Sequence, residues 1–277
     1  MELDVQARAK INLALDVLTE REDGYHDIDT IMQELDLYDT ITIESGRGGF
    51  VLTCDNPDLA LDESNLVFKA WDLLRGRVQN SSVNIHIKKN IPIAAGLAGG
   101  SSDAAATLVG LNRFWNLELN PKQLEEIASE IGSDCAFFIN GRTQRATGRG
   151  EILQPISSYH AKHVVLVNVG KPISSRYVYE HVQLNGEMKI DELVTYLQAD
   201  SPKAYGLMEN QLETVSFEAM PELKDIKEKL LQMGANAALM SGSGPSVFGI
   251  FESEEIAKQA HRELEDKYPY VFLTITI

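Results

Sequence analysis

The stretch Ile91–Trp115 reads IPIAAGLAGGSSDAAATLVGLNRFW, and it joins a glycine-rich segment to a strongly helical one. Glycine is common where a backbone must bend unusually or approach another group closely. The following residues place apolar side chains at helical spacing, at Ala104, Leu108, Leu111 and Trp115. The first amides of a helix have no partner within it and lie at the positive end of its dipole, which suits an anion. We therefore expect a phosphate-binding loop at Gly96–Ser102.

Two common phosphate loops are absent from the sequence. A Walker A loop requires G-x-x-x-x-G-K-[ST], and the pair Gly170–Lys171 leads into proline instead. The dinucleotide fingerprint G-x-G-x-x-G is missing near the N-terminal strands as well. What remains is P-x-x-x-G-L-x-G-G-S-S-D-A-A (Pro92–Ala105), in which the amides of Gly99–Ser102 can wrap a phosphate without a cationic side chain. The alternative is an ordinary helix start with Ser101 or Ser102 as its N-cap.

The composition is that of an ordinary soluble globular protein, with 277 residues, 44% of them hydrophobic and 24% charged. The 41 acidic and 25 basic side chains give a net charge of -16, which disfavours nucleic acid and anionic membrane as partners. Cys54 and Cys135 fit neither a disulfide framework nor a metal pattern, which favours a reducing, cytoplasmic location. The N-terminal residues MELDVQARAK do not resemble a targeting peptide, and no apolar run is long enough to span a membrane.

The N-terminal segment alternates apolar and polar residues from Leu3 to Val17. This period of two predicts a half-buried strand with one polar face, from which Lys10 and Asn12 project on the same side. The segments that follow predict a turn, two strands and a helix that begins with Ser64 as N-cap. In chain order they are Glu22–Asp29 (turn), Asp39–Ser45 (strand), Ser64–Leu74 (helix) and Ser82–Lys89 (strand).

After the glycine loop and its helix, a second helix is expected with Pro121 in its first turn and Gly132 at its end. Its apolar stripe is Leu124, Ile127, Ala128 and Ile131. Beyond residue 155 strands and helices are mixed without strict βαβ alternation, which favours an α+β fold in two lobes, 1–155 and 156–277, with a boundary near Ile152–Ser158. The elements expected there are the strand Lys162–Val169, two or three polar helices up to Gln211, the helix Glu222–Met233, the strand Ser246–Phe251, the helix Glu254–Lys267 and the strand Tyr270–Ile277.

Three separated motifs resemble those of the GHMP kinases, the family of galactokinase, homoserine kinase and mevalonate kinase. Ala7–Leu15 (ARAKINLAL) is similar to the first motif, Pro92–Ala105 to the second and Ser241–Phe251 (SGSGPSVFGIF) to the third. The resemblance implies a two-lobed fold with an N-terminal lobe like a ribosomal-protein domain, a ferredoxin-like C-terminal lobe and an active site in the cleft between them. Ala98 departs from the family's usual glycine, which is tolerable if its φ is negative.

The strings A-K-I-N-L, D-G-Y-H-D-I and G-S-D-x-A-F-F-I-x-G resemble one branch of this family. That branch phosphorylates the 2-hydroxyl of 4-diphosphocytidyl-2-C-methyl-D-erythritol in the non-mevalonate route to isoprenoid precursors. The resemblance implies ATP as phosphoryl donor, with Mg²⁺ held largely by phosphate oxygens and water rather than by a protein-built metal site. It also implies that Asp134 accepts the hydroxyl proton while Lys10 keeps that carboxylate ionised and oriented. From the residues alone, Asp134 could be a turn aspartate and Lys10 a solvated strand lysine.

The resemblance further implies which residues bind the two substrates. Tyr25 would stack on the cytosine and His26 would bond to its polar edge, with Asn12 beside them and either Tyr177 or Tyr179 as a second aromatic wall. Without the resemblance, EDGYHD reads as an ordinary surface turn. A third-motif loop is expected at Gly242, Ser243 and Gly244. The expected ATP-binding residues are Pro92, Ala94, Ala95, Gly96, Leu97, Ala98, Gly99, Gly100, Ser101, Ser102 and Asp103.

Alternatives remain open at this point. A kinase of the same family could act on homoserine or mevalonate, although neither acceptor would need the Tyr25–His26 pair. A non-catalytic, metabolite-binding member typically lacks the base or the lysine, whereas Asp134 and Lys10 are both present. A nucleic-acid-binding module is disfavoured by the charge of -16. The block TGRGE, with Arg149 and Glu151, is either structural or substrate-facing, and the protein is either a monomer or a homodimer.

Overall fold

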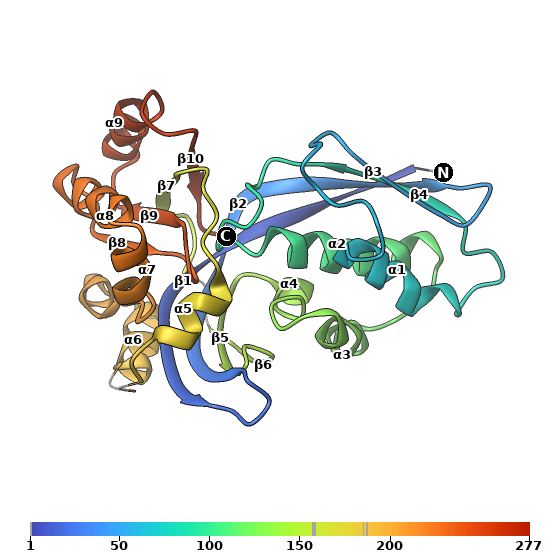
Figure 1. Ribbon diagram of the computed structural model, residues 1–277, viewed down its shortest axis with the longest axis horizontal. Coiled ribbons are helices and arrows are strands. Elements are labelled where there is room, and N and C mark those ends of the chain that lie inside the picture. The colour runs from blue at the N-terminus through green and yellow to red at the C-terminus, as the bar shows by residue number, and fades with distance from the viewer. Residues whose placement is uncertain (1, 157–158, 185, 187) are drawn as a thin grey trace. The chain divides into compact units, whose positions relative to one another are not determined.

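The computed structural model describes residues 2–156, 159–184, 186 and 188–277 (Figure 1). The chain forms two compact units, neither of which is one continuous stretch. Unit 1 comprises Met1–Ala9, Leu37–Ile93 and Ala98–Gly141, and unit 2 comprises Lys10–Asp36, Ala94–Leu97 and Arg142–Ile277. The expected lobes 1–155 and 156–277 stay a prediction, and part of their boundary, residues 157 and 158, lies outside the described residues. Both units mix helices and strands, so the α+β class is confirmed.

Two long paired strands, β1 (Glu2–Glu20) and β2 (His26–Ser45), contribute to both units. In unit 1, the end of β2 pairs antiparallel with β4 (Val83–Lys88), which pairs parallel with β3 (Phe50–Cys54). The helices of unit 1 lie on one face of these strands (Figure 1). They are α1 (Leu66–Arg75), α2 (Gly99–Phe114), α3 (Pro121–Ile131) and α4 (Phe137–Asn140).

The core of unit 1 forms where α2 packs on the sheet. Alternate residues of β4, namely Val83, Ile85 and Ile87, are buried, as a half-buried strand requires. Gly110 lets α2 approach closely, because a Cβ there would lie 2.5 Å from Ile43 Cδ1 of β2. The stripe predicted for α3 is buried and Gly132 follows its last turn, which confirms that helix. Removal of this apolar surface from water is the main force that holds the layer together.

Unit 2 contains a ferredoxin-like subdomain. Its antiparallel sheet has the order β10-β7-β9-β8, with α8 between β7 and β8 and α9 between β9 and β10, which is the β-α-β-β-α-β arrangement. This confirms the expected architecture of the C-terminal part. The bounds are β7 (His163–Asn168), α8 (Glu222–Gln232), β8 (Ala237–Met240), β9 (Ser246–Phe251), α9 (Glu254–Leu264) and β10 (Tyr270–Ile275).

Unit 2 contains further strands and helices outside this subdomain. The first part of β2 pairs antiparallel with β5, and β5 pairs with β6. In the described residues between β7 and α8, the chain forms four further helical segments. The bounds are β5 (Thr143–Gly148), β6 (Ile152–Pro155), α5 (Ser175–His181), α6 (Ile190–Gln198), the 3₁₀ helix η1 (Pro202–Leu207) and α7 (Glu213–Ala219).

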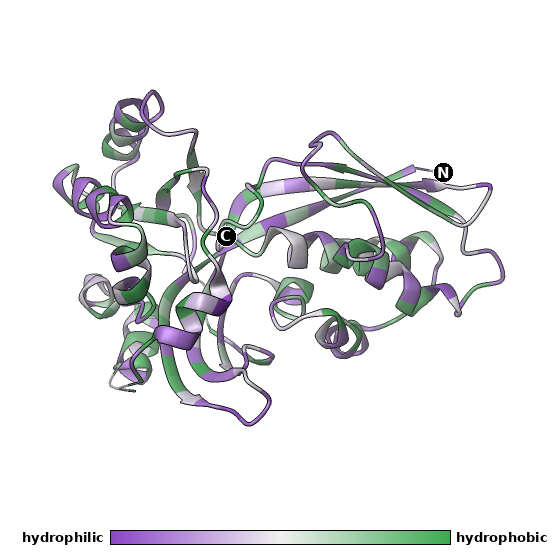
Figure 2. Cartoon of the chain, viewed as in Figure 1, coloured by the Kyte–Doolittle hydropathy of each residue, from purple (hydrophilic) through white to green (hydrophobic). Residues whose placement is uncertain are grey.

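The helices of the ferredoxin-like subdomain are amphipathic, and both α8 and α9 show green and purple residues in Figure 2. Leu223, Ile226 and Leu230 of α8 are buried in one cluster with Val165 and Val167 of β7. This apolar stripe confirms the predicted helix, which ends one residue early, at Gln232. None of the helices in the described parts of the chain is both long and apolar enough to cross a membrane.

Several local expectations were wrong or incomplete. The turn expected at Glu22–Asp29 ends before His26, where β2 begins. The N-cap of α1 is Asn65, whose Oδ1 accepts a hydrogen bond of 2.9 Å from Val67 N, and not Ser64. In β1 exposed and less exposed residues alternate only as far as Arg8, whereas every residue of Ala9–Val17 is buried, so both faces of that stretch are covered. The short elements β3, β5, β6, β8, α4 and α7 were not anticipated, since so few residues carry little periodicity.

Candidate active site

Lys10 and Asn12 project from the same side of β1, as expected, but both are buried, with exposed fractions of 5% and 2%. Lys10 Nζ donates a hydrogen bond of 2.7 Å to Asn12 Oδ1. Asn12 Nδ2 in turn donates to Thr30 Oγ1 on β2, at 2.8 Å. Burying an ammonium group is costly unless it is hydrogen-bonded or paired. The alternative that Lys10 is a solvated strand lysine is therefore excluded.

Parts of all three motifs meet within unit 2. Ser241 Oγ donates to Gly96 O at 2.8 Å, and Gly242 N donates to Asn12 Oδ1 at 3.1 Å. Lys10 N donates to Leu97 O at 3.1 Å. Gly96 has a φ of +74°, and a Cβ there would lie 2.2 Å from Ser241 O. Glycine is thus required at position 96 by conformation and by the close approach of the third motif.

The third-motif loop is held in place by a residue that was not expected at the site. Asn210 Nδ2 donates to Met240 O at 2.7 Å and to Gly242 O at 2.8 Å. Ser243 Oγ lies 2.7 Å from Ser175 Oγ, and Ser243 O accepts from Ser216 Oγ at 3.1 Å. No local pattern around Asn210 distinguishes it from other loop asparagines, so only the folded chain identifies it.

Helix α2 begins at Gly99 without a side-chain cap, and its N-cap residue is Ala98. The first helical bond that reaches back to Ala98 comes from Ser102 N, at 2.9 Å, so the amides of Gly99, Gly100 and Ser101 have no acceptor within the helix. The alternative of a serine N-cap is therefore wrong. Ala98 has a φ of +54°, so the condition under which alanine would be tolerated is not met, and the left-handed conformation costs about 1 kcal/mol.

A buried ionic cluster lies beneath this helix start. Lys89 Nζ donates to Asp103 Oδ2 at 2.7 Å and also bonds to Asp39, and all three side chains are almost fully buried. Asp39 Oδ1 accepts from the amides of Asn90 at 2.6 Å and Ile91 at 2.8 Å. A Cβ added at Gly99 would lie 3.2 Å from Lys89 Nζ. The cluster therefore supports the loop from inside unit 1.

Burial and the neighbouring charges shift the pKa values of Asp103 and Lys89. Burial raises the pKa of Asp103 to about 7, although the nearby Lys89 charge lowers it in part. Burial also lowers the pKa of Lys89, but Asp103 and Asp39 outweigh this effect and raise it overall. Lys89 is not among the residues expected at the site. The sequence nevertheless carries a signal for it, the alternation of Val83, Ile85 and Ile87, since a further step of two puts residue 89 on the same inward face.

Asp134 lies half-buried in the turn between α3 and α4 of unit 1. Its neighbour Cys135 is fully buried, and burial raises the pKa of that thiol to about 12 while a hydrogen bond with Ser101 lowers it in part. The turn that carries Asp134 is thereby bonded to the first turn of α2. Asp134 belongs to unit 1 and Lys10 to unit 2.

The aromatic residues expected to bind a base differ in their exposure and in their neighbours. Tyr25 is 56% exposed in the turn before β2. The ring of His26 lies 5.6 Å from that of Tyr179, centroid to centroid, with the planes tilted by 37°. Tyr177 contacts His181 instead, at 4.2 Å. Of the two candidates for the second wall, the fold places Tyr179 beside His26.

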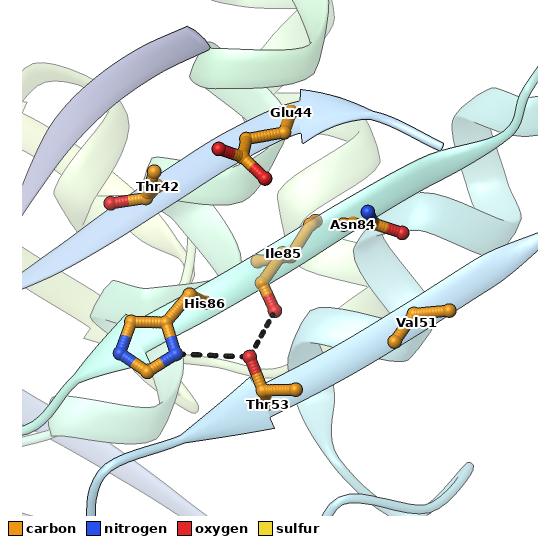
Figure 3. Close-up of a pocket in the computed structure, with 7 residues that line it drawn as sticks. All are labelled: Thr42, Glu44, Val51, Thr53, Asn84, Ile85 and His86. Atoms are coloured by element: carbon orange, nitrogen blue, oxygen red, sulfur yellow. Dashed lines mark hydrogen bonds between the residues drawn. The ribbon is translucent and has the colours of Figure 1, made fainter. Parts of the chain in front are cut away.

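A hollow of about 430 Å³ lies on the sheet of unit 1 and contains none of the expected site residues (Figure 3). Thr53 Oγ1 lies 2.9 Å from His86 Nδ1 and donates to Ile85 O at 3.4 Å. The side chains of Thr53 and His86 are thus paired with each other, and the hollow lies apart from the expected residues, so it does not support a site there. The remaining lining residues are Thr42, Glu44, Val51 and Asn84.

Comparison with known proteins shows which family the chain resembles. Residues 65–142 match the profile "GHMP kinases N terminal domain" and residues 196–269 match "GHMP kinases C terminal". The 4-diphosphocytidyl-2-C-methyl-D-erythritol kinase of Caldanaerobacter subterraneus is 42% identical over 100% of this chain and 98% of its own length. The protein of that name from Acetivibrio thermocellus is 40% identical over 99% of both chains.

Solved structures agree with these matches. A crystal structure of 4-(cytidine 5'-diphospho)-2C-methyl-D-erythritol kinase superposes with a TM-score of 0.85 at 30% identity, covering 99% of each chain. The homoserine kinase of Cytophaga hutchinsonii superposes with a TM-score of 0.81 at 17% identity, covering 100% of this chain and 94% of its own. The second likeness concerns the fold alone.

Proposed function

The chain belongs to the GHMP kinase family, and on this premise we propose that it phosphorylates the 2-hydroxyl of 4-diphosphocytidyl-2-C-methyl-D-erythritol with ATP, in the non-mevalonate route to isoprenoid precursors. Relatives of that name are 40% to 42% identical over almost the whole chain. The structural observation that carries the choice of substrate is the placement of His26 beside Tyr179, at 5.6 Å between ring centroids. An aromatic face stacks on a base while an imidazole bonds to its edge, and neither homoserine nor mevalonate has a base.

In this proposal Asp134 and Lys10 are the residues that promote the phosphoryl transfer. The acceptor hydroxyl gives its proton to the Asp134 carboxylate, its oxygen bonds to the γ-phosphorus, and the bond from that phosphorus to ADP breaks. Such a transfer depends on positioning and on neutralising charge more than on covalent help from the protein. The Lys10 ammonium supplies fixed positive charge. Asn12 orients it, because the amide of Asn12 is itself held by Thr30 and by the amide of Gly242.

In this proposal ATP binds to the glycine-rich loop and the start of α2. The amides of Gly99, Gly100 and Ser101 have no acceptor in the helix and suit a phosphate. Asp103 supports this loop through Lys89 rather than touching the nucleotide, since its side chain is 2% exposed. The remaining expected residues shape the loop around them; they are Pro92, Ala94, Ala95, Gly96, Leu97, Ala98 and Ser102.

The co-substrate is Mg-ATP. Phosphate oxygens and water supply most ligands of the magnesium, because Mg²⁺ bound to substrate phosphates keeps several waters and takes few protein ligands. Cys54 and Cys135 are both free thiols, which supports a reducing, cytoplasmic compartment.

A substrate panel tests the proposal. Purified protein is incubated with Mg-ATP and, separately, with 4-diphosphocytidyl-2-C-methyl-D-erythritol, homoserine and mevalonate, while ADP release and the phosphorylated product are followed. We expect turnover with the cytidylated alcohol alone. Turnover with homoserine or mevalonate alone would assign the chain to another branch of the family. Absence of turnover with all three, together with tight binding of one of them, would point to a non-catalytic member.

A further inference from the structure

Tyr25 presents a large ring to solvent from a short turn. Its side chain is 56% exposed, so burial does not hold the ring in place. If a stacking side chain becomes ordered only when the ligand binds, the cost of ordering it weakens binding. A side chain that is already held in place does not carry this cost. The neighbours that orient Tyr25 therefore bear on how well it can receive a base.

Arg149 is such a neighbour. Its guanidinium carbon lies 5.2 Å from the centroid of the Tyr25 ring, which is the distance of a cation–π contact. Arg149 belongs to the turn between β5 and β6, and Gly148 at the end of β5 pairs with Ile28 of β2. The strand register thus brings this turn beside the turn that carries Tyr25.

Both partners of this contact are held by their own turns. Glu151 Oε2 accepts from Arg149 N at 2.6 Å, and Glu151 Oε1 lies 3.6 Å from Arg149 Nε. Gly148 has a φ of +70°, and a Cβ there would lie 3.1 Å from the Glu151 carboxylate. On the other side, Asp23 Oδ1 accepts from Tyr25 N at 3.1 Å. These bonds hold the backbone of both turns, so the contact with the Arg149 guanidinium is left to orient the Tyr25 ring.

We propose that Arg149 is a positioning residue for the base of the nucleotide substrate: it covers one face of Tyr25 and fixes the ring so that the other face receives the cytosine. The inference rests on the proposed function, since it takes Tyr25 as the residue that binds the base. A planar guanidinium can stack on an aromatic ring, which lysine does less well. The same contact assigns the TGRGE block to substrate binding, through Tyr25, rather than to stability alone.

Arg149→Gln tests the proposal, with Arg47→Gln, at an exposed arginine between β2 and β3, as matched control. We expect KM for the cytidylated substrate to rise about two- to fivefold, the effect of losing an exposed cation–π contact, with kcat and KM for ATP unchanged. The inhibition constant of cytidine, which carries no phosphate, should rise by the same factor. Arg149→Lys should recover part of the loss, and Arg149→Gln should add nothing in a Tyr25→Leu background.

Each other outcome has a definite meaning. A rise in KM without a change for cytidine would show that Arg149 contacts the diphosphate, and a fall in KM would show that it competes with the base for the ring. Either result, or wild-type kinetics in Arg149→Gln, overturns the inference and leaves the proposed function intact. Failure of the unmodified protein to use the cytidylated substrate overturns the function itself.

Discussion

At the scale of single residues, the burial of a charged group in the fold is stronger evidence for a functional role than its position in a sequence motif. Lys10 stands on a strand whose pattern allows a solvated face, yet it is 5% exposed and bonded to Asn12. A protein retains a buried ammonium where its charge is used or firmly paired. Lys10 is therefore a stronger candidate for catalysis after folding than before it.

Asp134→Asn removes the proposed proton acceptor while keeping the size of the side chain. Because a positioned general base contributes about 10²–10⁴ in rate, kcat should fall by that factor. Steady-state kinetics measures kcat, and titration with a non-hydrolysable ATP analogue should show nearly unchanged nucleotide affinity. Near-normal turnover in this variant would remove Asp134 from the mechanism.

Lys10→Met keeps the length of the side chain and removes its charge. Loss of a preorganised charge at a reacting centre lowers kcat by about 10²–10³. If Lys10 and Asp134 act as a unit, the double variant Lys10→Met/Asp134→Asn should be no slower than the slower single variant, because groups that act together are not additive. A product of the two separate losses would mean that they act independently.

At the scale of elements, the glycine loop has two different reasons for its glycines. Gly96 is required for packing, since its φ is +74° and the third motif lies against it. Gly100 is exposed at the start of α2, and a Cβ there would meet nothing within 4 Å. The sequence of the loop does not show which glycine is required by packing. The atoms around each glycine in the folded chain do show it.

Gly96→Ala should be strongly destabilising, because the new Cβ would lie 2.2 Å from Ser241 O in a backbone conformation unsuited to alanine. We expect a loss of about 2 kcal/mol or more in the free energy of unfolding, as for other substitutions that force strain into a packed site. Gly100→Ala is the matched control and should keep or slightly raise stability, as alanine favours a helix by about 0.5–1 kcal/mol. Urea denaturation compares the two, and equal stabilities would contradict the role given to Gly96.

At the scale of the whole molecule, buried charge makes stability depend on pH. Burial raises the pKa of Asp103 to about 7, so between pH 4 and 7 the folded carboxyl holds a proton that the unfolded one has released. The contribution of this group to stability is therefore full below its ordinary pKa and is lost as pH rises through that window.

Asp103→Asn removes this titration but keeps a polar side chain of the same shape. The stability of the variant relative to wild type should improve from pH 5 to pH 8, because only wild-type Asp103 keeps, up to about pH 7 in the folded state, a proton that the unfolded state has released. Urea denaturation at both pH values measures the change, with the exposed Asp58→Asn as control. A relative stability that stays constant or worsens with pH would show that Asp103 is already ionised at pH 5.

The sequence alone determined the elements whose signals are local. The stripes of α3 and α8, the alternation of β4 and the glycine loop before α2 were all visible, because one buried face leaves a period in the residues that form it. Only the tertiary structure decided that both faces of Ala9–Val17 are covered, that Lys89 lies beneath the loop and that Tyr179 rather than Tyr177 stands beside His26. These facts depend on contacts between segments far apart in the chain, and periodicity carries no information on which distant segment will cover a given face.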